Sequence, residues 1–212
     1  MKIALIGASG FVGSAILNEA VSRGHSVTAI VRDTSKLNPH PQVRAVAVDA
    51  QDPQALADVL KGHDRVISAY NPGWSAPDIH DQYLKGASAI VEAANAAHSW
   101  LLVVGGAGSL EIAPGVQLVD TPDFPAEWKQ GALAARDGLT ALRRETTLDW
   151  RFVSPPVFLE PGEKRGGYRL GGDQVLFSGD KPAGITVGDL ADGVLNEAET
   201  PAHLRQRFTL GY

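Results

Sequence analysis

The opening stretch of the chain, MKIALIGASGFVG, constrains the fold more than any other feature of the sequence. Residues 3–7 are apolar on both sides of an extended chain, which predicts a buried strand. Three glycines follow at three-residue spacing, and Ser14–Arg23 then has helical periodicity. The order of strand, glycine turn and helix predicts an α/β fold built on a parallel sheet.

The glycine turn predicts a diphosphate-binding loop, since a helix that begins after such a turn presents free backbone N–H groups and a positive dipole end. Gly7 permits a sharp turn, Gly10 a close approach of phosphate, and Gly13 close packing of helix and strand. Ser9 replaces the second glycine of the GxGxxG pattern, and its hydroxyl can donate to phosphate. The alternative is a structural glycine turn. The residues expected to hold a pyrophosphate are Gly7, Ser9, Gly10, Phe11, Val12 and Gly13.

Composition excludes several other classes of protein. A chain of 212 residues buries roughly 70% of its unfolded surface as one domain. The absence of cysteine excludes disulfides and thiolate chemistry, and the six histidines show no metal-ligand spacing, so no metal site is expected. A net charge of −5 without a basic run argues against nucleic acid, and no apolar run reaches the ~18 residues of a membrane span. We expect a cytoplasmic protein.

The residue after the second predicted strand, Ser26–Val31, bears on the choice of nucleotide. An acidic residue about 20 positions after the glycine loop binds the ribose 2′-hydroxyl of NAD. Arg32 stands there instead, and a guanidinium suits a 2′-phosphate. NADP(H) is therefore favoured, with Lys36 in support, and NAD(H) remains possible if Arg32 is solvated and Asp33 binds the ribose.

Three motifs carry a family resemblance: GASGFVG at residues 7–13, VVGGAGSL at 103–110 and YRLGGD at 168–173. The chain resembles the extended and atypical short-chain dehydrogenases/reductases, and within them the small NADH-flavin reductases related to the biliverdin-IXβ-reductase type. The resemblance implies a doubly wound (Rossmann) fold, adenine binding by Asp49, closure over the nicotinamide at Pro155, and a substrate pocket in the C-terminal annex with Phe158. A plain turn residue is the alternative for Asp49.

The remaining pattern predicts six to seven mostly parallel strands in the order 3-2-1-4-5-6, in one domain of residues 1–212 with a small annex at 157–185. We expect an irregular covering loop at Glu111–Ala126 and a hairpin of Tyr168–Leu170 with Gln174–Phe177. Further strands are predicted at Val43–Val48, Arg65–Ala69, Trp100–Val104, Asp149–Ser154 and Arg207–Leu210. Helices are predicted at Pro53–Lys61 capped by Asp52, Pro77–Ala97, Glu127–Arg144, and Val187–Ala198 capped by Thr186.

The acceptor side of the site is predicted from residues that follow the fourth and fifth strands. Tyr70 and Trp74 can flank a planar group, and Asn71 can contact the nicotinamide ribose. The alternative is that Asn-Pro-Gly forms an ordinary turn. Gly105-Gly106-Ala107-Gly108 leaves bare backbone, which offers room for a flat ligand next to Ser109. Ser109 and Tyr70 are the candidate catalytic hydroxyls, and no general acid is identified. The expected substrate contacts are Trp74, Ser109, Trp128 and Phe158.

The best-known chemistry of the resembling family uses a tyrosine with a lysine four residues later. None of the four tyrosines, at 70, 83, 168 and 212, has that lysine, and Ala132 and Arg136 occupy the two positions. Reduction of a carbonyl to an alcohol needs a proton donor, whereas a conjugated ring system spreads the incoming electron pair over itself.

The sequence therefore predicts an NAD(P)H-dependent reductase of a small, planar flavin-like or quinone-like acceptor, with FMN or FAD as substrate. A non-catalytic NADP(H)-sensing regulator is the alternative, and the missing dyad disfavours a nucleotide-sugar epimerase or dehydratase. We expect a monomer or homodimer without nucleic-acid or membrane partners.

Overall fold

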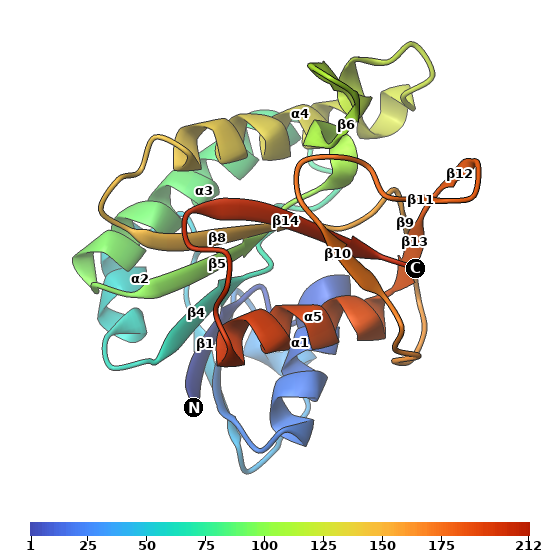
Figure 1. The fold of residues 1–212 in the computed structure, drawn as a ribbon. Coiled ribbons are helices and arrows are strands. Elements are labelled where there is room, and N and C mark those ends of the chain that lie inside the picture. Colours follow the sequence, from blue (N-terminus) through green and yellow to red (C-terminus); the bar gives the residue numbers. More distant parts are fainter.

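The computed structural model describes residues 1–212, and its centre is one eight-stranded sheet (Figure 1). Seven of the strands are parallel and the last, at one edge, is antiparallel. The predicted order of the first six strands is confirmed, and the sheet has one strand more than the upper predicted number. In spatial order the strands are β3 (Val43–Ala47), β2 (Ser26–Val31), β1 (Lys2–Ile6), β4 (Arg65–Ser68), β5 (Trp100–Val104), β8 (Asp149–Ser154), β14 (Gln206–Gly211) and β10 (Arg169–Gly171).

Five helices cover the two faces of this sheet, two on one face and three on the other (Figure 1). They are α1 (Phe11–Ser22), α2 (Pro53–Leu60), α3 (Ile79–Ala96), α4 (Ala126–Leu142) and α5 (Val187–Glu199). Alternate residues of β1 serve the two layers, because successive side chains of a strand point to opposite faces. Ile3 and Leu5 pack in the layer that contains α1 and α5, while Ala4 and Ile6 pack in the layer of α2, α3 and α4. The doubly wound architecture is thus confirmed.

Two helix starts follow from the capping residues in the sequence. The Asp52 carboxylate accepts a hydrogen bond from the Ala55 N–H at 3.0 Å, and Pro53 fills the first turn. The Thr186 hydroxyl accepts from the Asp189 N–H at 3.2 Å. Both predicted caps are confirmed. None of the helices is at once long and apolar enough to cross a membrane.

Two predictions beyond the sheet are wrong. The segment 111–126 is not irregular: β6 (Glu111–Ala113) and β7 (Val116–Gln117) form a short antiparallel hairpin, and the 3-10 turn η3 (Leu118–Asp120) follows. The positive φ of 73° at Gly115 supplies the tight turn between the strands.

The predicted hairpin around Gly171–Asp173 does not form either. β10 pairs instead with β14, so it extends the main sheet, and the true hairpin joins β11 (Phe177–Ser178) to β12 (Lys181–Pro182). β9 (Phe158–Glu160) pairs in parallel with β13 (Gly184–Thr186). The β6–β7 and β11–β12 hairpins both project beyond the same end of the sheet, where the parallel strands finish (Figure 1).

Candidate functional site

The glycine loop between β1 and α1 contains two glycines that the fold itself requires. Gly7 has a φ of 80°, and a Cβ atom there would lie 2.6 Å from the Ala69 carbonyl oxygen. A Cβ on Gly13 would lie 2.0 Å from the Gly7 carbonyl oxygen. Gly10 is different, because its Cβ would meet only the Gly7 oxygen, at 3.4 Å. The protein gives no steric reason for glycine at this position, so the open space faces whatever binds the loop.

The loop also presents unused hydrogen-bond donors. Gly10 is the N-cap of α1, and no side chain caps this helix. The Gly10 N–H donates to the Gly7 carbonyl at 3.0 Å and the Ser14 N–H to the Gly10 carbonyl at 2.8 Å. Free backbone donors at a helix N-terminus are the chemistry that binds a diphosphate, so the residues present fit that group. The backbone N–H groups without an acceptor in the chain belong to Ala8, Ser9, Phe11, Val12 and Gly13.

At the end of β2, Arg32 and Asp33 differ in how far contacts within the chain already engage them. The Asp33 carboxylate caps a 3-10 turn, η1 (Thr34–Lys36), accepting from the Ser35 hydroxyl at 2.7 Å and the Ser35 N–H at 3.0 Å. These two hydrogen bonds lower the pKa of Asp33. Arg32 is exposed and forms no ion pair within the chain. The cation is therefore free for a ligand, while Oδ1 of the Asp33 carboxylate is already engaged and its Oδ2 makes no hydrogen bond within the chain.

Asp49 follows β3 at the same end of the sheet. Its carboxylate is exposed and accepts from the Gln51 N–H at 3.0 Å, which makes it a turn residue with a free second oxygen. Asp49 is therefore a turn residue, as the alternative interpretation held. Its second carboxylate oxygen remains free to accept a hydrogen bond from adenine.

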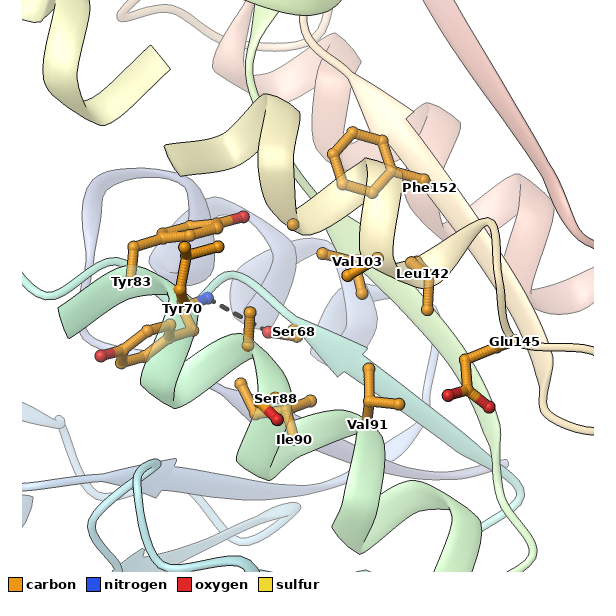
Figure 2. Close-up of a pocket in the computed structure, with 14 residues that line it drawn as sticks. Ser68, Tyr70, Tyr83, Ser88, Ile90, Val91, Val103, Leu142, Glu145 and Phe152 are labelled. Atoms are coloured by element: carbon orange, nitrogen blue, oxygen red, sulfur yellow. Dashed lines mark hydrogen bonds between the residues drawn. The ribbon is translucent and has the colours of Figure 1, made fainter. Parts of the chain in front are cut away.

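Tyr70 leaves β4 with its side chain turned toward α3 and away from the glycine loop. Its hydroxyl donates to the Gln82 carbonyl at 3.0 Å, and its ring lies where a Cβ on Gly86 would be, at 2.3 Å (Figure 2). Burial raises the pKa of Tyr70. The Asn71 side chain accepts from the Gly73 N–H at 2.8 Å. The structure thus gives both residues local structural roles, and it does not present the Tyr70 hydroxyl as a proton donor.

The glycines after β5 do not all leave open space, contrary to the prediction. A Cβ on Gly105 would lie 1.9 Å from the Phe152 ring, and one on Gly108 would lie 2.8 Å from the Ala132 Cβ. Both glycines are therefore needed for packing. Only Gly106, whose nearest neighbour would be the Ala135 Cβ at 3.7 Å, leaves room.

Ser109 is not available to an acceptor in this arrangement. It is 3% exposed in the 3-10 turn η2 (Ala107–Ser109), and its hydroxyl accepts from the buried Arg207 guanidinium at 3.4 Å. Arg207 also donates to the Ser154 hydroxyl at 3.2 Å and to the Asp173 carboxylate at 2.7 Å. Burial lowers the pKa of Arg207. This cluster fastens η2 and the annex to β14.

The Arg207 cluster is the part of the site region that sequence reasoning missed. Asp173 closes the motif YRLGGD and also pairs with Arg143 at 2.7 Å. Tyr168 opens the motif and donates to the Asp192 carboxylate at 2.7 Å. The one available signal was the arginine that opens the predicted strand Arg207–Leu210 next to Phe208, since a cation that becomes buried requires a partner.

Three exposed aromatic side chains lie near the acceptor end. Trp74 is 62% exposed, and its ring stacks over Gly131 of α4, where a Cβ would be 2.6 Å away. Trp128, one turn earlier on α4, is 54% exposed, and Phe158 of β9 is 57% exposed. Pro155 lies buried at the end of β8. The structure brings Trp74 and Trp128 to the same half of α4.

The two positions of the tyrosine–lysine dyad hold no proton donor for a cleft. Ala132 packs against Gly108. Arg136 points to carboxylates, with Asp120 at 3.1 Å and Asp137 at 3.2 Å. The two positions are thus occupied by a small residue packed against the turn after β5 and by an arginine that pairs with carboxylates.

Comparison with known proteins identifies the family. A family profile described as NAD(P)H-binding matches residues 7–201. This chain belongs to that NAD(P)H-binding family. The protein YwnB of Bacillus subtilis (strain 168), described as uncharacterized, is 40% identical over 214 residues, which cover 99% of this chain and 98% of YwnB.

Two solved structures are also closely similar. A "putative epimerase" from Bacteroides thetaiotaomicron is 41% identical with a TM-score of 0.93, covering 100% of this chain and 96% of the other. A "putative NADH-flavin reductase" from Streptococcus pneumoniae TIGR4 is 39% identical with a TM-score of 0.89, covering 100% and 99%. The resemblance stated from the sequence is confirmed, together with binding of a nicotinamide nucleotide.

Proposed function

We propose that this protein is an NADPH-dependent reductase whose acceptor is a planar, flavin-like or quinone-like molecule. The observation that carries the proposal is the packing of Ala132 against Gly108, which leaves no tyrosine hydroxyl where a carbonyl reductase needs one. A reduced nicotinamide, when bound, supplies a hydride. The protein then has to align an acceptor that stabilises its own charge, and a general acid is not required.

The residues of the acceptor side fit a flat molecule. Gly106 leaves free space after β5, and indole surface is exposed by Trp74, in the segment between β4 and α3, and by Trp128 of α4. Exposed aromatic rings offer stacking surface, which aligns a planar ligand without a fixed hydrogen-bond pattern. The similar protein from Streptococcus pneumoniae is described as a "putative NADH-flavin reductase", which supports this class of acceptor. The epimerase description of the Bacteroides protein fits less well, since this chain lacks the tyrosine–lysine pair.

The preference for NADPH rests on the contrast between Arg32 and Asp33. One oxygen of the Asp33 carboxylate, Oδ1, already accepts two hydrogen bonds from Ser35, while Arg32 makes no ion pair within the chain and can donate two parallel hydrogen bonds to a 2′-phosphate. Arg32→Asp should weaken NADPH binding at least about tenfold more than NADH binding. Equal weakening of both would show that Arg32 does not contact the 2′-phosphate.

Stopped-flow mixing of the protein with NADPH and FMN tests the reductase itself. We expect loss of NADPH absorbance faster than in free solution, and a slower rate in the double variant Trp74→Ala/Trp128→Ala with unchanged NADPH affinity. An oxidation rate no higher than that without protein, with FMN and a quinone alike, would refute the reductase. Tight NADPH binding under those conditions would instead support the nucleotide-sensing regulator.

A further inference from the structure

A cavity of about 140 Å³ lies between α3, α4 and the sheet, and Tyr70 and Tyr83 are among the residues that line it (Figure 2). Its floor is the central strand β5, where Val103 is only half-buried although its strand neighbours Leu102 and Val104 are buried. Its mouth lies between the two helices, at the exposed residues Ser88 and Ala141. The cavity is therefore open to entry between α3 and α4 and reaches the interior of the fold.

The lining is mostly apolar, with one unusual polar group. Ten of the 14 lining residues are hydrophobic, among them Ile90, Leu142 and Phe152. Tyr83 is 6% exposed, and its hydroxyl makes no hydrogen bond within the chain. Figure 2 shows this hydroxyl directed into the ring of lining residues, whereas the Tyr70 hydroxyl points away from it. Burial raises the pKa of Tyr83 to about 12, so the group is a neutral hydrogen-bond donor near neutral pH.

We propose that this cavity is a second binding site, separate from the nucleotide loop, for a small uncharged aromatic molecule that carries one hydrogen-bond acceptor. A dry apolar cavity of about 150 Å³ in a protein takes up a benzene-sized molecule, and this cavity has a similar volume. The Tyr83 hydroxyl has no partner within the chain and faces the cavity, so a ligand that brings an acceptor to it gains a hydrogen bond worth about 1 kcal/mol. The proposal does not depend on the identity of the hydride acceptor.

The orientation of the tyrosines explains why the site is selective for small ligands. A Cβ on Gly138 would lie 3.1 Å from the Tyr83 ring, and one on Gly86 would lie 2.3 Å from the Tyr70 ring. Both helices thus approach the rings closely, and the space left within the lining is about 140 Å³. Flavins and nucleotides are too large for this volume.

Benzonitrile is a suitable probe, since it is aromatic, uncharged and carries a single strong acceptor. Saturable binding to the wild-type protein is expected by calorimetry, and it should persist when the protein is saturated with NADP⁺. Tyr83→Phe should bind about fivefold more weakly. The infrared stretching band of the bound nitrile should differ between wild type and Tyr83→Phe, because the frequency of a nitrile changes when its nitrogen accepts a hydrogen bond.

Two alanine substitutions locate the probe. Ala141→Leu, at the exposed mouth, should reduce binding at least tenfold, while Ala96→Leu, at an exposed position of α3 outside the cavity, should leave it unchanged. Circular dichroism checks that both variants fold. The proposal is overturned by any of four results: absence of saturable binding, displacement by NADP⁺, equal binding to Ala141→Leu and wild type, or identical nitrile bands in wild type and Tyr83→Phe. A change of oligomeric state in Ala141→Leu would assign the opening to a contact between copies and would also overturn it.

Discussion

The contrast between Gly10 and Gly13 predicts that two similar substitutions in one loop have separable effects. A Cβ on Gly13 would lie 2.0 Å from the Gly7 carbonyl oxygen, and this backbone atom cannot rotate away as a side chain would. Overpacking of this kind costs roughly 3 kcal/mol. For a chain of this size that cost lowers Tm by about 6 to 12 °C in Gly13→Ala.

Gly10→Ala should instead fold well and bind poorly. Its Cβ meets only the Gly7 oxygen at 3.4 Å, and alanine in place of glycine at an N-cap costs at most about 1 kcal/mol. The same Cβ occupies the space through which a phosphate reaches the helix N-terminus, so NADPH affinity should fall at least about tenfold, which is ~1.4 kcal/mol.

Urea unfolding and calorimetric titration with NADPH, applied to both variants, measure the two quantities independently. Wild-type NADPH affinity in Gly10→Ala would refute the assignment of the loop to a diphosphate. Equal loss of stability in Gly10→Ala and Gly13→Ala would refute the steric argument.

Three further predictions concern groups outside the loop. Tyr70→Phe loses the hydrogen bond to Gln82, so stability should fall by about 1 kcal/mol with an unchanged rate of hydride transfer, and a large drop in kcat would contradict this. Burial raises the pKa of Asp189, but hydrogen bonds from Tyr212 and two backbone N–H groups outweigh it, so the folded pKa is low. The stability from this carboxylate is full above the ordinary aspartate pKa of about 4 and is lost as pH falls through the folded value; urea unfolding against pH should show a shallower slope in Asp189→Asn than in wild type. Hydrogen bonds to Asp137 and Asp81 raise the pKa of His80, so its contribution is full below about pH 6.5 and is lost as pH rises through the folded value, and His80→Gln should remove that dependence.

The sheet and helices were predictable because each depends on local signals. Apolar runs mark β1, β2 and β5, and Asp52 and Thr186 mark helix starts. The diphosphate loop was equally local, since its three glycines and the helix lie within one short stretch of chain.

The acceptor side was less predictable because it depends on contacts between distant segments. Gly105 lies against Phe152, about 50 residues later in the chain, and Ser109 is held by Arg207, about 100 residues later. No sequence pattern around Gly105 or Ser109 indicates that Phe152 and Arg207 are their partners. The pairing of β10 with β14 was not predicted for the same reason. The glycines after Leu170 are typical of a hairpin turn, and nothing near them in the sequence indicates the distant strand.

Amide chemical shifts recorded during titration with NADP⁺ test the central claim most directly. The account predicts that the largest changes fall on the five N–H groups that have no acceptor in the chain, those of Ala8, Ser9, Phe11, Val12 and Gly13. Unchanged amides in this loop at saturating NADP⁺, with changes elsewhere in the protein, would contradict it.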